Sequence, residues 1–269
     1  MTFNMKIKSM FWGGLFILAG AMLLLSNLGI VTVNVWKLIW PTFIIAAGVW
    51  TLWTASQGPE ALEIEEVSIP HQNAESAKIK LEFGAGQVKM NSGAAANELF
   101  QGTFAGGAAY SSKLEGGMLK VNLKPPSTDI TQVVSPWSWG AREWQINLND
   151  RIPLSIGVET GASSMVLDLS DLQVKELNLD TGASSTEITL PARAGHTHVD
   201  VDGGAASIAL HIPEGVAARI QVDSGLSAIS VDRDRFPRMG DVYKSADYDT
   251  AENKVDITAD IGAGSLAIK

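Results

Sequence analysis

Cysteine is absent from this chain of 269 residues, which excludes a disulfide framework and any site built on thiolates. Charge is missing from one long stretch, because no charged residue lies between Lys8 and Lys37. Basic residues are few overall, since 20 Lys and Arg stand against 29 Asp and Glu and the net charge is −9. Nucleic-acid binding needs clustered Lys and Arg, so this balance argues against such a partner.

Enzyme signatures are also missing. The sequence has no G-x-S-x-G elbow, no phosphate-binding P-loop and no H-E-x-x-H motif. The chain has four histidines, and His196 and His198 alternate on the outward face of one predicted strand. Because a zinc site needs three or four convergent ligands, two alternating histidines do not predict one. We therefore expect no catalytic residue, no cofactor and no metal site.

Residues 1–54 contain two long apolar runs, which predict a transmembrane helical hairpin. Its spans cover about 10–28 and 37–54, which is the length that a bilayer requires. A cleaved signal peptide is disfavoured, because the first run leads into a second apolar stretch without a small-residue cleavage site. The second run is bracketed by aromatic rings of the kind found at membrane interfaces, namely Trp36, Trp40, Trp50 and Trp53.

The positive charges predict how this hairpin is oriented. Lys6 and Lys8 precede the first span, whereas the connecting loop has no cation before Lys37. Positive residues favour the cytoplasmic side, and two spans return the chain to the side from which it started. We therefore expect a multi-pass membrane protein whose C-terminal domain is cytoplasmic. Residues 55–76 are polar and contain Gly58, Pro59 and Pro70, which indicates a linker.

From residue 77 onward the sequence repeats one pattern around a shared glycine. Aliphatic residues lie five and three positions before that glycine and four and six positions after it, with few exceptions. A period of two on each side predicts a strand, a turn at the glycine and a second strand. The shared glycines are Gly84, Gly161, Gly182, Gly204, Gly225 and Gly262.

The spacing of the repeat predicts an all-β fold. The middle four glycines lie 21, 22 and 21 residues apart, so coils of about 21 residues stack as parallel strands in a single β-solenoid. Residues 77–150 are less regular and 151–269 are regular. An immunoglobulin-like sandwich also has short alternating strands, but it does not repeat one turn at a constant interval.

An acidic residue stands two positions before each glycine. A ladder of carboxylates could bind divalent cations, but each turn offers only one. The simpler interpretation is that the acid accepts hydrogen bonds from its own turn while the glycine supplies a positive φ. These residues are Glu82, Glu159, Asp180, Asp202, Asp223 and Asp260.

An aromatic cluster lies in the less regular part of the domain, around Pro136 and Gly140. Solenoids must cover their open ends, and large rings can form such a cap. The same rings could instead form a docking patch for a partner or for the membrane interface. The cluster consists of Trp137, Trp139 and Trp144.

Two stretches resemble a known bacterial family. Residues 13–30 and 36–48 resemble the transmembrane region of LiaI/LiaF-like proteins, and residues 153–222 resemble the toastrack β-solenoid found behind such regions. The resemblance implies a cell-membrane protein of the cell-envelope stress response, with a sensor kinase or another membrane protein as partner. Family members commonly have four spans, whereas this chain shows two. The family supplies no catalytic residues.

Three functions remain open at this point. The first is a non-enzymatic, membrane-anchored regulator or interaction module of the LiaF-like kind. The second is a structural scaffold that self-associates at the membrane. The third, and least favoured, is a carbohydrate-active solenoid enzyme, which would need an outer groove joining carboxylates within about 5–10 Å.

Overall fold

The computed structural model describes residues 17, 40–41, 43–46, 48–49, 62–126 and 142–269, and the chain divides into two compact units, Met1–Gly58 and Pro59–Lys269. The described residues of the first unit are helical. Both predicted spans lie largely outside the described residues, as do Trp137 and Trp139. Within the part of the chain that is described, no helix has the length and apolar character needed to cross a membrane.

The described part of the second unit is all-β. Its thirteen strands are β1 (Ile64–Pro70), β2 (Ser76–Ser92), β3 (Glu98–Ala105), β4 (Ala109–Glu115), β5 (Met118–Lys124), β6 (Glu143–Leu148), β7 (Leu154–Asp168), β8 (Val174–Thr189), β9 (His196–His211), β10 (Ala217–Val231), β11 (Arg238–Met239), β12 (Val242–Lys244) and β13 (Lys254–Ile268).

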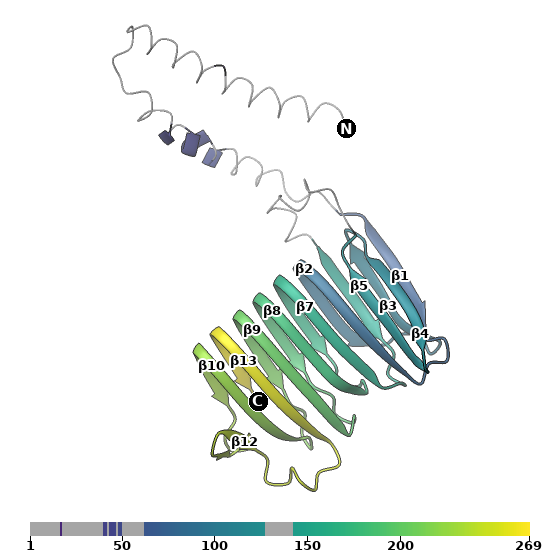
Figure 1. Ribbon diagram of the computed structural model, residues 1–269, viewed down its shortest axis with the longest axis vertical. Coiled ribbons are helices and arrows are strands. Elements are labelled where there is room, and N and C mark those ends of the chain that lie inside the picture. The colour runs from purple at the N-terminus through teal and green to yellow at the C-terminus, as the bar shows by residue number, and fades with distance from the viewer. Residues whose placement is uncertain (1–16, 18–39, 42, 47, 50–61, 127–141) are drawn as a thin grey trace. The chain divides into compact units, whose positions relative to one another are not determined.

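Six long strands stack side by side in parallel, in the order β2, β7, β8, β9, β13 and β10 (Figure 1). This is the predicted β-solenoid, and its parallel ladders exclude the sandwich. Neighbouring coils keep one register, so equivalent repeat positions lie opposite each other. For example, Ile156 of β7 pairs with Leu177 of β8, and Leu177 pairs with Val199 of β9.

The order of the last two coils differs from the expected order of the chain. The C-terminal strand β13 lies between β9 and β10, so Gly262 follows Gly204 in the stack and Gly225 comes last. The pattern could not reveal this, because every coil carries the same register and the excursion over 232–253 is long enough to cross β10. Because β13 lies between β9 and β10, its residues Leu266 and Ile268 are fully buried.

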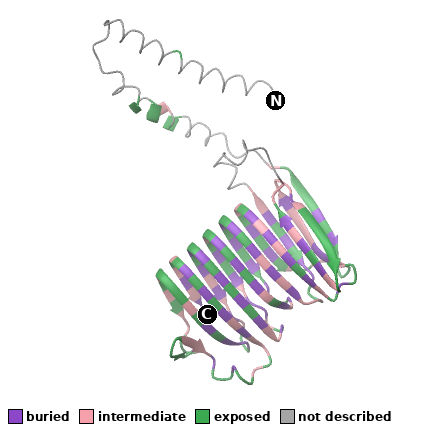
Figure 2. Cartoon of the chain, viewed as in Figure 1, coloured by how far each residue is buried: buried purple, intermediate pink, exposed green. Residues whose placement is uncertain are grey.

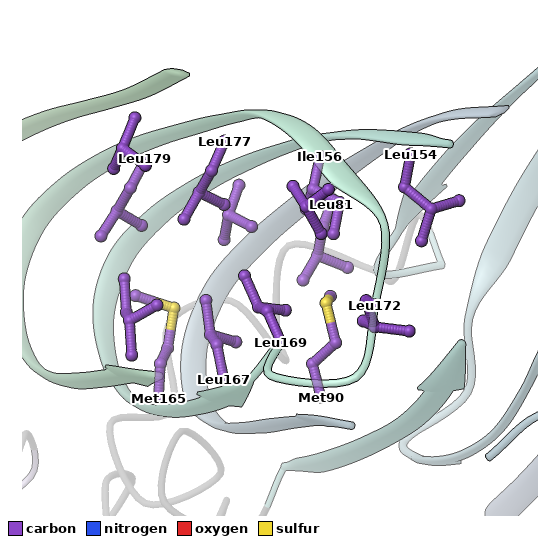
Figure 3. Close-up of a cluster of buried hydrophobic side chains, with 14 of the residues drawn as sticks. Leu81, Met90, Leu154, Ile156, Met165, Leu167, Leu169, Leu172, Leu177 and Leu179 are labelled. Carbon is purple, nitrogen blue, oxygen red and sulfur yellow. The ribbon is translucent and has the colours of Figure 1, made fainter. Parts of the chain in front are cut away.

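The core lies inside the coils, between the two halves of each long strand. Buried and exposed residues alternate along most of β7, β8 and β9, which gives the banding in Figure 2. In Figure 3, Leu177 and Leu179 from the first half of β8 face Met165 and Leu167 from the second half of β7. Each such side chain stabilises the fold by about 1.5–3 kcal/mol when it is fully buried.

The shared glycine is a bend within one continuous strand, and this corrects the predicted strand–turn–strand unit. Pairing runs through the bend and omits only the glycine, as where Thr160 pairs with Thr181 and Ala162 with Ala183. None of the six shared glycines has a positive φ, so the expected reason for glycine was also wrong. A Cβ on Gly182 would lie 2.7 Å from the carbonyl oxygen of Gly161, and close stacking therefore requires glycine.

The N-terminal end of the stack is closed by shorter strands. β6 and β5 pair in parallel with the two halves of β2, and β3, β1 and β4 extend them in antiparallel pairs. Residues 64–70 were expected to belong to the linker but form β1, because Val67 and Ile69 alternate with polar residues and are buried. The prediction of a linker over 55–76 is therefore wrong for residues 64–70.

The C-terminal end of the stack is only partly covered. β12 pairs with Arg219 to Gln221 in the first half of β10, and β11 pairs with β12. Among the described residues, no strand pairs with the outer edge of β10 from Val222 onward. Val222, Ile229 and Val231 are only partly buried there. The second half of β10 is thus an open sheet edge.

Candidate functional site

The predicted carboxylates form a single row on the outer face of the solenoid. The ladder registers place them opposite one another from each coil to the next, and five of the six are exposed. We call this row the acidic column, and in stack order it comprises Glu82, Glu159, Asp180, Asp202, Asp260 and Asp223.

Neutralising contacts are confined to one end of the acidic column. Lys80 Nζ lies 2.9 Å from Glu159 Oε1 and 3.5 Å from Glu82 Oε1, and the hydrogen bond to Glu159 helps raise the pKa of Lys80. The aspartates of the other coils form no ion pair with any described residue. The outer face carries a shallow depression of about 490 Å³, lined in part by Lys80, Glu159, Asp180, Asp202 and Asp260.

The acidic column does not perform the turn chemistry that we expected of it. No carboxylate in the column accepts a hydrogen bond from a backbone N–H among the described residues, and the contact of Glu82 is with the side-chain amide of Asn122 at 3.4 Å. The four aspartates of the column therefore project into solvent. Like charges opposite one another on neighbouring strands destabilise a sheet, so the column opposes folding.

A second group of polar side chains lies on the same face. Asp256 of β13 is opposite His198 of β9 in the ladder, and Asp256 Oδ2 is 2.7 Å from His196 Nε2 and 3.7 Å from His198 Nδ1. The other oxygen, Oδ1, accepts hydrogen bonds from Tyr248 Oη at 2.5 Å and from Arg219 Nε at 2.7 Å. We call His196, His198 and Asp256 the histidine–aspartate cluster.

The pKa values of this group follow from its contacts. Burial raises the pKa of the Asp256 carboxyl, but hydrogen bonds from Tyr248, His196 and Arg219 together hold it below its usual value. Burial and the hydrogen bond to Asp256 raise the pKa of Tyr248 to about 12. Asp256 is therefore a carboxylate at neutral pH, and Tyr248 keeps its proton and donates a hydrogen bond to it.

Sequence reasoning missed Asp256, Tyr248 and Arg219. It found the outward histidines but could not place β13 beside β9, because β13 is inserted out of chain order. A signal was present, since Asp256 and His198 each lie six residues before a shared glycine. Aligning the repeats puts both residues in one row, but only the tertiary structure makes them neighbours.

The predicted aromatic cluster is described only at Trp144. This ring is fully buried in β6 and meets Phe83 and Phe104 edge to face, with ring centroids 5.0 Å apart in both pairs. A buried ring offers no docking surface, so its position supports the capping interpretation at the N-terminal end of the stack. Capping or docking by Trp137 and Trp139 stays a prediction.

Parallel coils, a glycine at each bend and a row of outward acids define a β-solenoid module. The chain belongs to the toast-rack family, because the model described as the N-terminal domain of toast_rack, DUF2154, matches residues 58–211. Residues 10–52 match the LiaI-LiaF-like transmembrane region. The chain is thus a membrane-associated, LiaF-like family member.

One solved structure supports the fold. A candidate cell adhesion protein from Clostridium sporogenes is 22% identical with a TM-score of 0.69, over 77% of this chain and 99% of its own. A candidate adhesin from Bacteroides fragilis is 7% identical over 77% of this chain and 97% of its own, and its TM-score of 0.24 is too low to inform the fold. No curated protein matches the chain.

Proposed function

We propose that this protein is a non-enzymatic, membrane-anchored interaction module that regulates a bacterial cell-envelope stress response. The observation that carries the proposal is the unneutralised part of the acidic column, because four aspartates are aligned on a rigid sheet at a cost in stability. Such a row fits a basic surface on a membrane partner such as a sensor kinase. Complementary charge speeds association and suppresses binding to wrong partners.

The family match supports the membrane anchor in this proposal. Under this proposal, two spans hold the solenoid on the cytoplasmic side, where the solenoid can reach the cytoplasmic part of a kinase. Two reporters fused after Lys269 test this orientation, one active only in the cytoplasm and one active only outside it. Activity of the second reporter alone would place the domain outside and remove a cytoplasmic partner.

A reporter of envelope stress, assayed without antibiotic, tests the regulatory role. Deletion of the chain is expected to raise reporter output, because the LiaF-like family implies repression. The triple variant D180N/D202N/D260N should reproduce that rise at an unchanged protein level. The matched control neutralises three carboxylates outside the acidic column, as D171N/E187Q/E214Q, and should leave output unchanged. Full repression by the first triple variant would refute binding through the acidic column.

The open edge of β10 favours a second candidate function, a scaffold that self-associates. β10 carries Leu226 at the position directly after the shared glycine, and this side chain is 89% exposed. The other five coils carry alanine at that position, namely Ala85, Ala162, Ala183, Ala205 and Ala263. An unpaired edge with exposed apolar side chains is a template for pairing with another chain.

Sedimentation of the full chain in detergent, measured over a range of concentrations, tests this second function. A scaffold should form dimers or larger species as concentration rises, and Leu226→Lys should shift the equilibrium toward monomer. Met239→Lys is the control, since Met239 is also exposed but lies on β11. A monomer at all concentrations would exclude self-association.

An enzyme is less well supported, although the depression joins several carboxylates. Glycosidases need two carboxyl groups whose different surroundings separate an acid from a base or nucleophile. Asp180, Asp202 and Asp260 share the same exposed setting in one row. Nothing in their surroundings distinguishes one role from the other.

A further inference from the structure

The histidine–aspartate cluster has the donor set of a transition-metal site. Its ligand atoms are two imidazole nitrogens and one carboxylate oxygen, and all three lie within 4.8 Å of one another. Tetrahedral zinc binds such atoms at about 2.0–2.2 Å, which places them about 3.3 Å apart around the ion. The side chains of His196 and His198 are 41% and 63% exposed, so both rings have room to rotate and solvent can reach the centre.

The carboxylate of Asp256 is oriented toward the histidines by groups behind it. Tyr248 and Arg219 both donate to Oδ1, which leaves Oδ2 directed at the two imidazole rings. The Asp256 side chain is only 14% exposed, and Tyr248 is buried. Partners that fix a ligand from behind are typical of metal sites and raise their affinity.

The charges around the cluster permit a cation. Arg219 offsets the charge of Asp256, but Glu176 of β8 is opposite His198 on its other side, and the acidic column runs along the same face. Imidazole with carboxylate suits zinc and its neighbours in the first transition series, whereas calcium and magnesium prefer oxygen ligands alone.

We propose that His196, His198 and Asp256 bind one divalent transition-metal ion of the zinc class, with water completing the coordination. The ion joins β9 to β13, whose ligands are about 60 residues apart in the chain. It thereby fastens the strand that enters the stack out of order, and binding stabilises the folded solenoid. This inference does not depend on the proposed regulatory function.

Calorimetric titration of the full chain in detergent with Zn²⁺ tests the proposal, using an affinity tag without histidine. One ion per chain should bind, and zinc should raise the melting temperature. His196→Gln and His198→Gln should each weaken binding at least tenfold and reduce the thermal shift. Both variants should fold, because neither histidine side chain is buried.

His211→Gln is the matched control, since His211 lies on the same strand but pairs with Glu187 at 3.1 Å. It should leave zinc affinity unchanged. Co²⁺ adds a second readout, because a site with imidazole ligands and an open position gives a visible absorption band that the His196→Gln variant should lose. Equal zinc affinity in the wild type and in the H196Q/H198Q double variant would overturn the proposal, as would a dissociation constant above 1 mM.

Discussion

Gly182 packs so closely on Gly161 that a Cβ on the former would lie 2.7 Å from the carbonyl oxygen of the latter. The same relation recurs in the stack. A Cβ on Gly204 would lie 3.0 Å from the carbonyl oxygen of Gly182, and a Cβ on Gly262 would lie 2.8 Å from that of Gly204. Each oxygen belongs to a backbone held by ladder hydrogen bonds, so it has little freedom to move. The repeated glycine is therefore a requirement of stacking one coil on another.

Gly182→Ala should destabilise the solenoid by about 1–3 kcal/mol, because the added methyl group overpacks against a fixed backbone. Gly84 supplies the matched control, since it begins the glycine column and a Cβ there meets nothing within 4 Å. Gly84→Ala should change stability by no more than about 0.5 kcal/mol. Urea unfolding of both variants measures the difference, and equal losses would show that stacking is not the reason for glycine.

Leu179→Ala should lower the free energy of unfolding by about 2–5 kcal/mol, because it opens a cavity between the two halves of the coil. Leu179 is 1% exposed and lies among the side chains drawn in Figure 3. Val166 lies on β7 but points outward with 44% exposure, so Val166→Ala should be nearly neutral. Denaturant unfolding checks both, and a tolerated Leu179→Ala would contradict a shared core.

Asp202→Asn should stabilise the fold at low ionic strength, because Asp180 and Asp260 are opposite it on the neighbouring strands. Relief of this repulsion should raise the melting temperature by about 1–3 °C, and the gain should shrink in 1 M salt. Glu159→Gln is the comparison, since Lys80 already neutralises Glu159. Thermal unfolding at two salt concentrations tests this. A gain in melting temperature that persists in high salt would point to a cause other than charge repulsion.

Lys89→Met should lower stability more at pH 7 than at pH 3. The hydrogen bond from Lys89, with help from Gln145, holds the pKa of Glu143 below its ordinary value of 4.5. A lowered carboxyl pKa contributes stability above the ordinary value, and that contribution is lost as pH falls through the lowered one. The pair is exposed, so the melting temperature should fall by no more than about 2 °C.

The same change should have little effect in a Glu143→Gln background, because the charged partner is then missing. Thermal unfolding of the wild type, the two single variants and the double variant at both pH values completes this cycle. An equal effect of Lys89→Met at pH 3 and pH 7 would assign the loss to packing of the lysine side chain rather than to the ion pair.

The repeat made most of the fold predictable. Alternating aliphatic residues around one glycine specify which side chains face inward, and constant spacing specifies stacked coils, so residues such as Leu177 and Val199 could be placed in the core. The N-terminal strands were harder to predict. β1 is short and acidic, and the apolar residues that define it, Val67 and Ile69, are only two.

The candidate site was likewise predictable only in part. The acidic column follows from position within the repeat, because residues at one offset share a row whatever the order of the coils. The histidine–aspartate cluster does not follow from it, because it needs β13 beside β9 and Arg219 beyond β13. Two glycine-centred units with the same offsets can exchange places in a stack without breaking the pattern.

The sequence by itself determined the coil, its inward and outward faces, the row of acids and the apolar runs that precede them. Its periodicity acts within each coil and therefore sets local structure and register. Only the tertiary structure decided the order of the last coils, the open edge of β10 and the meeting of His198 with Asp256. Those features depend on which complete set of contacts has the lowest free energy, and a pattern shared by all coils cannot encode that choice.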